Sequence, residues 1–186
     1  MKKTFDSVSL ESLEIALRRL KIPGKIIKYI INLSHERQLK IITAYGLTEE
    51  IKAGDGIDQG EVISPLLWRI FYDPLLDRIQ NKTELGYTIS YKTTSESQFA
   101  LQREYRQAAI AYADDTTWIA RSKDQLEEIV KLANKFFNIN DIQINGTKSK
   151  LIVMNTKLHA EERKIFFRNA EVRAEKEKVI IKALGI

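Results

Sequence analysis

The segment Tyr-Ala-Asp-Asp at residues 112–115 constrains this sequence most, because it places adjacent carboxylates between two short β-type segments. The flanking residues, 109–111 and 116–120, are rich in β-branched and aromatic side chains and predict a β-hairpin with a two-residue connection. Tight hairpin turns favour Asn-Gly or Asp-Gly, whereas Asp114 and Asp115 supply no glycine and set like charges side by side. A divalent cation would offset that cost, since Mg²⁺ accepts one or two carboxylates. Taken alone, the motif also fits an acidic, solvated turn.

A second motif lies upstream, at residues 56–67, and reads Gly-Ile-Asp-Gln-Gly-Glu-Val-Ile-Ser-Pro-Leu-Leu. It predicts a loop that leads into a helix, with Ser64 as the N-cap and Pro65 at the first helical position. Apolar residues then recur at helical spacing, and a kink is expected at Pro74. These apolar residues are Leu67, Ile70, Phe71, Leu75 and Ile79.

The glycines of this second motif carry information that an ordinary capped core helix does not explain. Gly56 and Gly60 bracket Gln59. Glycine suits a backbone that bends sharply and that a ligand approaches closely. The pattern therefore predicts a ligand-binding loop, with Gln59 as the polar group at the point of approach.

Five segments in this order resemble the palm of a reverse transcriptase, most closely the non-LTR (LINE-like) retrotransposon type. They are residues 3–8 (Lys-Thr-Phe-Asp-Ser-Val), 56–67, 112–115, 145–149 (Asn-Gly-Thr-Lys-Ser) and 183–186 (Ala-Leu-Gly-Ile). In family terms they match the tail of motif A, motifs B, C and D, and the start of motif E. The resemblance spans nearly the whole chain, with variable spacers between residues 81 and 105 and between residues 157 and 178.

The resemblance implies nucleotidyl transfer, in which a DNA primer 3′-hydroxyl on an RNA template attacks the α-phosphate of a deoxynucleoside triphosphate and pyrophosphate leaves. It implies two Mg²⁺ or Mn²⁺ ions, with Asp114 as the principal ligand and Asp115 as the second carboxylate. Tyr112 would pack beside the primer terminus. Lys148 would protonate or neutralise the leaving pyrophosphate, although a solvated surface lysine is the alternative.

The same resemblance assigns further substrate contacts around the first two motifs. Phe5 would lie under the sugar and exclude a 2′-hydroxyl, a role that is compatible with a buried core phenylalanine. Gln59, Gly60 and Ser64 would contact the substrates from motif B. Asp58 departs from the family, which commonly has a basic residue at that position, so a template contact there is in doubt.

The family's motif A aspartate would precede Met1, and Asp6 is better interpreted as a helix cap than as its substitute. We therefore expect a fragment of an RNA-directed DNA polymerase that is inactive alone and active in a longer parent, with fingers and thumb outside this chain. The alternative is a catalytically dead palm remnant that at most binds nucleic acid. A non-catalytic structural α+β domain would explain none of the motif order.

Composition agrees with these expectations. Thirty basic and 25 acidic residues give a net charge of +5, which favours contact with a phosphate backbone, and the chain lacks cysteine. The apolar run 26–33 is short and contains a lysine, so no membrane segment is expected. A soluble intracellular protein, in nucleus or cytoplasm, is predicted, while the sequence indicates no oligomeric state.

The predicted fold is a single α+β domain over residues 1–186, with a mostly antiparallel sheet and helices packed on one face. Helices are expected at 9–20 and from 24 to about 34, followed by a hairpin of residues 37–43 and 47–52. After the Tyr-Ala-Asp-Asp hairpin, Ser122 and Gln125 predict a capping box that starts a further helix. Strands are expected near Ile142 and over residues 151–154.

Overall fold

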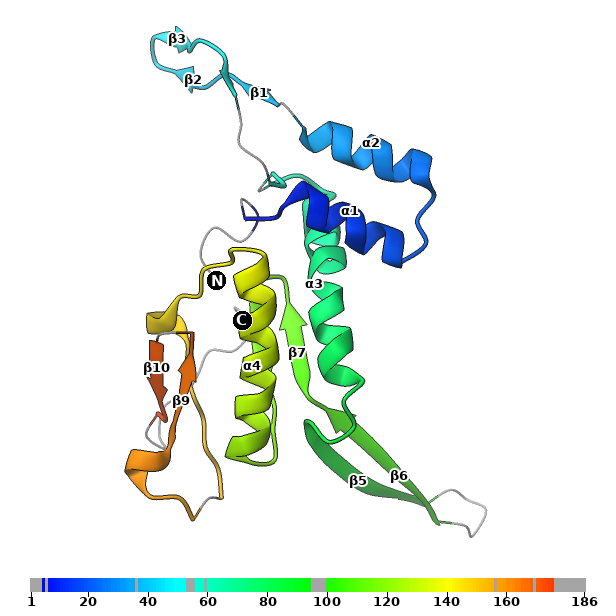
Figure 1. The fold of residues 1–186 in the computed structure, drawn as a ribbon, viewed down its shortest axis with the longest axis vertical. Helices are drawn as coiled ribbons and strands as arrows, with labels where there is room; N and C mark the ends of the chain where they lie inside the picture. The colour runs from blue at the N-terminus through cyan, green and yellow to red at the C-terminus, as the bar shows by residue number, and fades with distance from the viewer. Residues whose placement is uncertain are drawn as a thin grey trace. The chain divides into compact units, whose positions relative to one another are not determined.

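The computed structural model describes residues 5, 7–35, 37–52, 56–58, 60–94, 100–155, 157–168 and 170–175, with backbone alone at 92–94 and 100–102. The chain divides into two compact units. Unit 1 comprises Met1–Pro74 and Phe137–Gln143, and unit 2 comprises Leu75–Phe136 and Ile144–Ile186. Helix α3 (Ser64–Gln80) and helix α4 (Lys123–Ile139) each contribute residues to both units (Figure 1).

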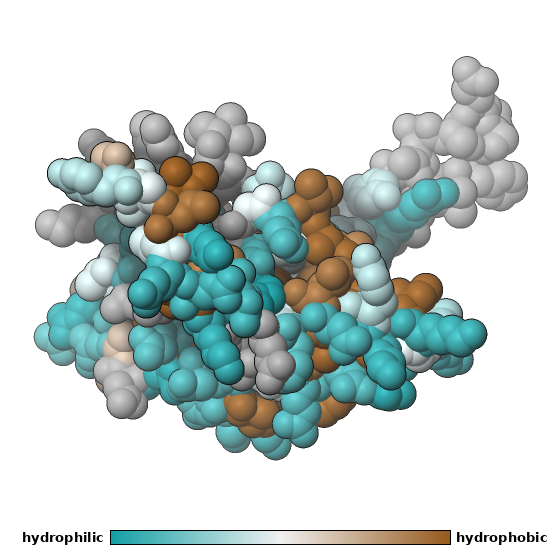
Figure 2. Space-filling view, turned by 90° about the horizontal axis from the view of Figure 1, so that it is seen from above, coloured by the Kyte–Doolittle hydropathy of each residue, from teal (hydrophilic) through white to brown (hydrophobic). Residues whose placement is uncertain are grey.

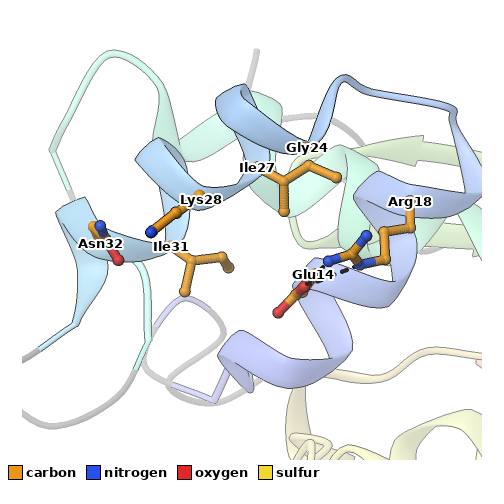
Figure 3. A pocket seen from close by; sticks show the side chains of 7 residues that line it. All are labelled: Glu14, Arg18, Gly24, Ile27, Lys28, Ile31 and Asn32. Atoms are coloured by element: carbon orange, nitrogen blue, oxygen red, sulfur yellow. Dashed lines mark hydrogen bonds and ion pairs between the residues drawn. The ribbon is translucent and has the colours of Figure 1, made fainter.

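Unit 1 begins with two packed helices, α1 (Leu10–Arg19) and α2 (Gly24–Ser34). The Ser9 hydroxyl accepts a hydrogen bond from the Ser12 N–H at 3.3 Å and caps α1, as its residue type favours. Both helices were predicted from the sequence and are confirmed. An open groove between them is lined by Glu14, Arg18, Gly24, Ile27, Lys28, Ile31 and Asn32 (Figure 3).

Two short antiparallel ladders follow α2 and form one ribbon (Figure 1). The outer ladder pairs β2 (Ile42–Thr43) with β3 (Gly46–Leu47), and the inner ladder pairs β1 (Gln38–Leu39) with β4 (Ile51–Lys52). The predicted hairpin around Tyr45 and Gly46 is therefore confirmed. Every strand residue of this ribbon is exposed.

Aromatic rings form much of the core of unit 1. Trp68 and Tyr72 of α3 stack with ring centroids 5.3 Å apart, and Tyr72 stacks on Phe137 at 6.3 Å. Trp68 also contacts Phe71 at 5.5 Å and Phe5 at 6.1 Å. Because large aromatic surfaces dominate core energetics, this cluster fixes the first half of α3 relative to Phe5.

The described residues of unit 2 contain three antiparallel hairpins. The first pairs β5 (Tyr87–Thr94) with β6 (Ala100–Gln107), the second pairs β7 (Ala109–Tyr112) with β8 (Asp115–Trp118), and the third pairs β9 (Lys164–Phe167) with β10 (Ala170–Arg173). Two 3₁₀ turns, η1 (Gly146–Lys148) and η2 (Ala160–Glu162), lie between α4 and β9. The buried side chains of this unit are Leu75, Ile79, Leu85, Ala108, Ile129, Val130, Ala133, Leu151, Ile165, Phe167 and Val172.

Arg106 of β6 connects the first hairpin to the end of α3. Its guanidinium donates to the carbonyls of Gln80, Lys82 and Leu85, the last at 2.6 Å. The final carbonyls of a helix lack intrahelical donors and carry partial negative charge, so an arginine stabilises them. This contact holds β6, and therefore the start of β7, at a defined position.

The α+β class with antiparallel strand pairing, predicted from the sequence, is confirmed. Among the described residues, however, the strands pair only two by two, in five separate ladders. The strand predicted over residues 151–154 is wrong, because Leu151 makes only one isolated bridge, to Ala174. The strand predicted near Ile142 is reduced to a single β-bridge residue, Gln143, and the Ile142 N–H donates to the Phe137 carbonyl at 2.9 Å in the turn after α4.

The capping box predicted at Ser122 and Gln125 is confirmed in one half only. The helix after the Tyr-Ala-Asp-Asp hairpin is confirmed as α4, and the Ser122 hydroxyl accepts from the Gln125 N–H at 3.3 Å. The reciprocal half of the capping box is wrong, because the Gln125 side chain accepts from Arg121 rather than from Ser122. The Gln125 amide instead donates to the Glu84 carbonyl at 2.6 Å.

Surface character also follows from the structure. Hydrophilic residues cover most of the surface that Figure 2 shows, and hydrophobic residues reach it in several places. No helix in the described part of the chain is long and apolar enough to cross a membrane. The positions expected for Asp6 as a cap and for residues 183–186 as motif E lie outside the described residues.

Candidate active site

The β7–β8 hairpin presents two different faces. Its register pairs Tyr112 with Asp115 and Ile110 with Thr117, and these four residues are exposed. Ala111 pairs with Thr116, and Ala109 pairs with Trp118, on the half-buried face. Because residues directly opposite in a ladder point to the same side, Tyr112 and Asp115 lie next to each other on the solvent face.

The turn of this hairpin differs from the sequence prediction by one residue. The two connecting residues are Ala113 and Asp114, while Asp115 is already the first residue of β8. Ala113 has a positive φ of 50°, and Asp114 is not among the positive-φ residues. Glycine normally occupies a central position of positive φ in a two-residue hairpin turn. An alanine there costs about 1–2 kcal/mol.

The strained turn places both carboxylates where a cation can reach them. Asp114 is half-buried, and Asp115 is exposed. Within the described part of the chain, no group of three or more histidine, aspartate or glutamate side chains could hold a metal ion. Two adjacent carboxylates nevertheless suit Mg²⁺, which takes one or two carboxylates and completes its coordination with water and substrate phosphate. The donor set therefore fits a hard divalent cation.

The root of the hairpin is packed tightly. A Cβ on Gly86 would lie 2.8 Å from the Gln107 carbonyl oxygen and 2.9 Å from the Ala108 Cβ. Gly86 also has a positive φ of 97°, so only glycine fits both the space and the backbone. Ala108 is fully buried, and its carbonyl accepts from the Ile119 N–H at 2.8 Å. The two ends of the hairpin are thus held together beneath the strained turn.

In unit 1, the loop of the second motif is held by two neighbours. The Ile57 N–H donates to the Phe5 carbonyl at 3.1 Å, so the structure brings the first two motifs together. Arg37 forms an ion pair with Asp58 and donates to the Gly56 carbonyl at 3.2 Å. The acidic residue at the position where the family commonly has a basic one is therefore balanced by Arg37.

The two glycines of this loop behave as predicted. Gly56 and Gly60 have positive φ values of 126° and 105°. A Cβ on Gly60 would meet no atom within 4 Å, so it is the backbone conformation that favours glycine there. Gln59 lies outside the described residues.

Ser64 is not the N-cap that the sequence indicated. Helix α3 begins at Ser64, and the Leu67 N–H donates to the Ile63 carbonyl at 3.0 Å, so the cap position belongs to Ile63. The Ser64 side chain is 1% exposed, and its hydroxyl has no hydrogen-bond partner among the residues that the structure describes. Pro65 consequently occupies the second helical position. Proline still fits there, because the first turn of a helix leaves its N–H groups unpaired.

Lys148 lies at the end of the η1 turn and is exposed. The Asn145 carbonyl accepts from the N–H groups of Lys148 and Ser149, both at 3.1 Å, and from the Ser149 hydroxyl at 3.0 Å. A Cβ on Gly146 would lie 2.8 Å from the Ala170 Cβ of β10. This turn therefore packs closely against β10 and fixes the backbone at Lys148.

The comparison with protein families agrees with this motif order. A model described as "Reverse transcriptase (RNA-dependent DNA polymerase)" matches residues 1–186. The chain belongs to the reverse transcriptase family. Divalent metal dependence and the use of nucleic acid and nucleoside triphosphate substrates are general in this family.

Curated relatives name the branch of the reverse transcriptase family. This chain is 28% identical over 129 residues, 68% of its length, to the "Retrovirus-related Pol polyprotein from type-1 retrotransposable element R2" of Nasonia vitripennis. It is 27% identical over 150 residues, 80% of its length, to the Popillia japonica protein of the same description. These matches cover 11% and 19% of the relatives, so the chain spans less than a fifth of their length. The predicted retrotransposon type is confirmed.

The two units divide the predicted site residues of this reverse transcriptase segment. Unit 1 contains Phe5, Gly60 and Ser64, and unit 2 contains Tyr112, Asp114, Asp115 and Lys148. Phe5 is half-buried against Trp68, which agrees with the core role weighed for it.

Sequence reasoning missed the residues that support the site. Arg37 and Arg106 carry no local motif signal, because their partners are backbone carbonyls and a carboxylate distant in the sequence. The β5–β6 hairpin lies largely within residues 81–105, which the sequence comparison treats as a variable spacer. The alternation of Tyr87, Ile89 and Tyr91 with polar residues was the available signal.

Proposed function

We propose that this chain supplies the palm portion of an RNA-directed DNA polymerase site, which transfers deoxynucleotides to a primer 3′-hydroxyl. The observation that carries the proposal is the β7–β8 hairpin, in which Tyr112 and Asp115 share an exposed face beside Asp114 in a strained turn. Strain of this kind persists where the surrounding structure supports it and clusters at active sites. The tight packing of Gly86 beneath Ala108 is such support.

In this proposal, Asp114 and Asp115 hold two Mg²⁺ or Mn²⁺ ions together with substrate phosphates. Bound divalent cations supply the positive charge that stabilises the attacking and leaving oxygens of an in-line displacement. Tyr112 lies beside Asp115 on the same face and positions the primer terminus. Lys148 is an exposed ammonium on a fixed turn and neutralises the leaving pyrophosphate.

The residues of unit 1 contribute substrate contacts. Gly60 and Gln59 form the loop that the substrates approach, and Phe5 packs beneath the sugar. Arg37 keeps this loop in place by binding Asp58 and the Gly56 carbonyl. Because Ser64 is buried, its role is to shape the start of α3. The RNA template, the DNA primer and the nucleoside triphosphate are the substrates proposed.

Metal binding tests the carboxylate assignment in the chain itself. Titration with Mn²⁺, followed by electron paramagnetic resonance, should show binding that Asp114→Asn weakens strongly and Asp115→Asn weakens less. Asp141→Asn is the matched control, because Asp141 is an exposed aspartate with a positive φ of 49°, which asparagine also tolerates. Equal Mn²⁺ binding by Asp114→Asn and by the unmodified chain would contradict the assignment.

Activity is tested in the longest polypeptide expressed from the locus that contains these residues, since the relatives are much longer than this chain. Primer extension on an RNA template should require Mg²⁺ and fall by at least about 100-fold in Asp114→Asn. Asp141→Asn should extend normally. Extension that survives Asp114→Asn would overturn the proposed function.

A further inference from the structure

The β5–β6 hairpin has one face rich in tyrosine. Its register pairs Tyr87 with Gln107, Ile89 with Tyr105, and Tyr91 with Arg103. Because paired residues and alternate residues of a strand point to the same side, these six side chains share one face. We call it the tyrosine face, and it consists of Tyr87, Ile89, Tyr91, Arg103, Tyr105 and Gln107.

The tyrosine face is open to solvent. Tyr87, Tyr91 and Tyr105 are 48%, 46% and 58% exposed. Ile89 and Arg103 are also exposed. Tyr105 lies diagonally across the ladder from the other two tyrosines, a separation of about 7–8 Å that leaves the rings as neighbours. Three exposed aromatic rings therefore form one continuous array in unit 2.

The opposite face of the same hairpin has a different composition. Glu104 accepts a hydrogen bond from the Ser90 hydroxyl at 3.4 Å, and Arg106 is engaged with the carbonyls at the end of α3. Among the described side chains of the hairpin, the Glu104 carboxylate thus lies on the face opposite to the tyrosine face. The charge on the tyrosine face itself is the positive charge of Arg103. The tyrosine face therefore suits a negatively charged ligand with flat surfaces.

Single-stranded nucleic acid has both of these properties. Bases stack on aromatic side chains whatever their sequence, and a nearby arginine attracts the phosphates or stacks on a base. The chain as a whole carries a net charge of +5, which favours a phosphate backbone over a basic or neutral protein partner.

The tyrosine face is also close to the candidate active site along the chain, and hydrogen bonds connect the two. Tyr105 donates to the Gln107 side-chain oxygen at 2.5 Å, and the Gln107 amide donates to the carbonyl of Ala109 in β7. Only Ala108 separates β6 from β7. Seven residues lead from Tyr105 to Tyr112, so the two lie at most about 25 Å apart. A strand bound to the tyrosine face is thus within several nucleotides of the Tyr-Ala-Asp-Asp hairpin.

We propose that the tyrosine face binds single-stranded nucleic acid and holds the unpaired template strand near the site of polymerisation. The identity of the bound strand as the template rests on the proposed function, whereas the binding of single-stranded nucleic acid does not depend on catalysis. Tyr91 and Tyr105 stack bases, and Arg103 contacts a phosphate.

Fluorescence anisotropy with labelled single-stranded RNA and DNA of about 12 nucleotides tests the proposal in the unmodified chain. Tyr105→Thr and Tyr91→Thr keep a good strand-forming residue and should each weaken binding by about 5- to 140-fold. Tyr45→Thr is the matched control, because Tyr45 is fully exposed at the β2–β3 turn, outside this face. Unchanged binding in both face variants, or equal loss in Tyr45→Thr, would overturn the proposal.

Salt dependence separates a phosphate contact from a general charge effect. Arg103→Gln should reduce the slope of log affinity against log salt by about 0.7. Lys135→Gln, an exposed lysine of α4, should leave the slope unchanged. Equal slopes for Arg103→Gln and the unmodified chain would remove Arg103 from the proposed contact surface and contradict the charge argument.

Cross-linking guards against variants that fail to fold. Irradiation of the unmodified chain with 4-thiouridine RNA should join the RNA to peptides that contain Tyr91 or Tyr105. Cross-links confined to other segments would overturn the inference. Stronger binding of RNA than of DNA favours a template role, whereas equal binding supports the face as a general single-strand surface.

Comparing Asp114→Asn with Tyr105→Thr separates an effect on catalysis from an effect on RNA binding. Asp114→Asn should retain RNA binding, because Asp114 is not part of the tyrosine face. Loss of binding in Tyr105→Thr with normal RNA binding in Asp114→Asn supports the inference even if no primer extension is found. Extension that depends on Asp114, with RNA binding unaffected by the tyrosine variants, supports the proposed function and rejects this inference.

Discussion

Two tight hairpins of this chain have the same length and opposite turn chemistry. In β2–β3, two residues connect the pair Thr43 and Gly46, and in β7–β8 two residues connect the pair Tyr112 and Asp115. The first turn ends at a glycine with a φ of 113°. In addition, the Thr43 hydroxyl donates to the Gly46 carbonyl at 2.8 Å and accepts from the Tyr45 N–H.

The second turn lacks these advantages. Its positive φ is borne by Ala113, and carboxylates occupy the next two positions. The comparison shows that the exposed ribbon of unit 1 uses residues that ease a turn, whereas the β7–β8 hairpin keeps residues that strain it. Such strain is expected where side-chain chemistry, rather than stability, decides the sequence.

The hairpins also differ in how they are anchored. A Cβ on Gly46 would meet no atom within 4 Å, whereas a Cβ on Gly86 would collide with the root of β7. The β7–β8 hairpin is therefore strained at its tip and closely packed at its base. Substitutions at Gly86, Gly46 and Ala113 test this contrast.

Gly86→Ala should have the largest effect on stability. The new methyl group would meet backbone atoms at a backbone conformation that disfavours alanine, which together cost about 3 kcal/mol. The melting temperature should fall by about 6–12 °C. Gly24→Ala is the control, because a Cβ there meets open space and Gly24 has no positive φ. An unchanged melting temperature in Gly86→Ala would mean that the base is not tightly packed.

Gly46→Ala should destabilise the chain less, since only the backbone conformation opposes it. The expected cost is about 1–2 kcal/mol, measured as the free energy of unfolding in urea. Thr43→Val removes the side-chain hydrogen bonds of the same turn and should cost about 1 kcal/mol. A larger loss in Gly46→Ala than in Gly86→Ala would reverse the comparison.

Ala113→Gly should stabilise the chain by about 0.5–1 kcal/mol. Glycine relieves the positive φ of the turn, and part of that gain is offset by its greater freedom in the unfolded state. Ala111→Gly, two residues earlier in β7, should instead destabilise the chain. If Ala113→Gly lowers the free energy of unfolding, the turn is not strained.

Glu128→Gln should have the smallest effect, confined to acidic pH. The hydrogen bond from Lys82 to the Glu128 carboxylate, 2.9 Å long, lowers the pKa of Glu128 below 4.5, and the positive charge of Lys82 adds to this. A lowered pKa contributes stability above pH 4.5 that is lost as the pH falls through the folded-state value. The free energy of unfolding, measured at several pH values from pH 7 to pH 3, should therefore fall less steeply with decreasing pH in Glu128→Gln. Lys82→Gln should reduce this pH dependence similarly. A pH dependence of Glu128→Gln identical to that of the unmodified chain would contradict the interaction between Lys82 and Glu128.

Elements with a clear local signal could be predicted from the sequence. The leucine spacing of α1, the Pro-Gly break before α2 and the alternation around Asp114 each depend on neighbours in the chain. The positive φ values of Gly56 and Gly60 followed from residue type alone. The residue types of the Tyr-Ala-Asp-Asp segment likewise predicted a hairpin that carries two carboxylates.

Other features depend on contacts that the sequence does not display. Ser64 looked like an N-cap, yet the first helical carbonyl belongs to Ile63, so the hydroxyl is buried inside the first turn. The turn of β7–β8 moved by one residue, because strand pairing extends to Tyr112 and Asp115. The β9–β10 hairpin was hidden by the many charged residues in its segment, which alternate with the buried Ile165, Phe167 and Val172.

The ion pair between Arg37 and Asp58 has a consequence for how copies of mobile elements are judged intact or decayed. A survey that scores each motif position by its residue type would count Asp58 as the loss of a positive charge. In space, Arg37 neutralises the Asp58 carboxylate, from a segment that belongs to no motif. A copy with Asp58 but without Arg37 would lose both this ion pair and the hydrogen bond to the Gly56 carbonyl. Paired substitutions of this kind would distinguish inherited divergence from decay when many such sequences are aligned.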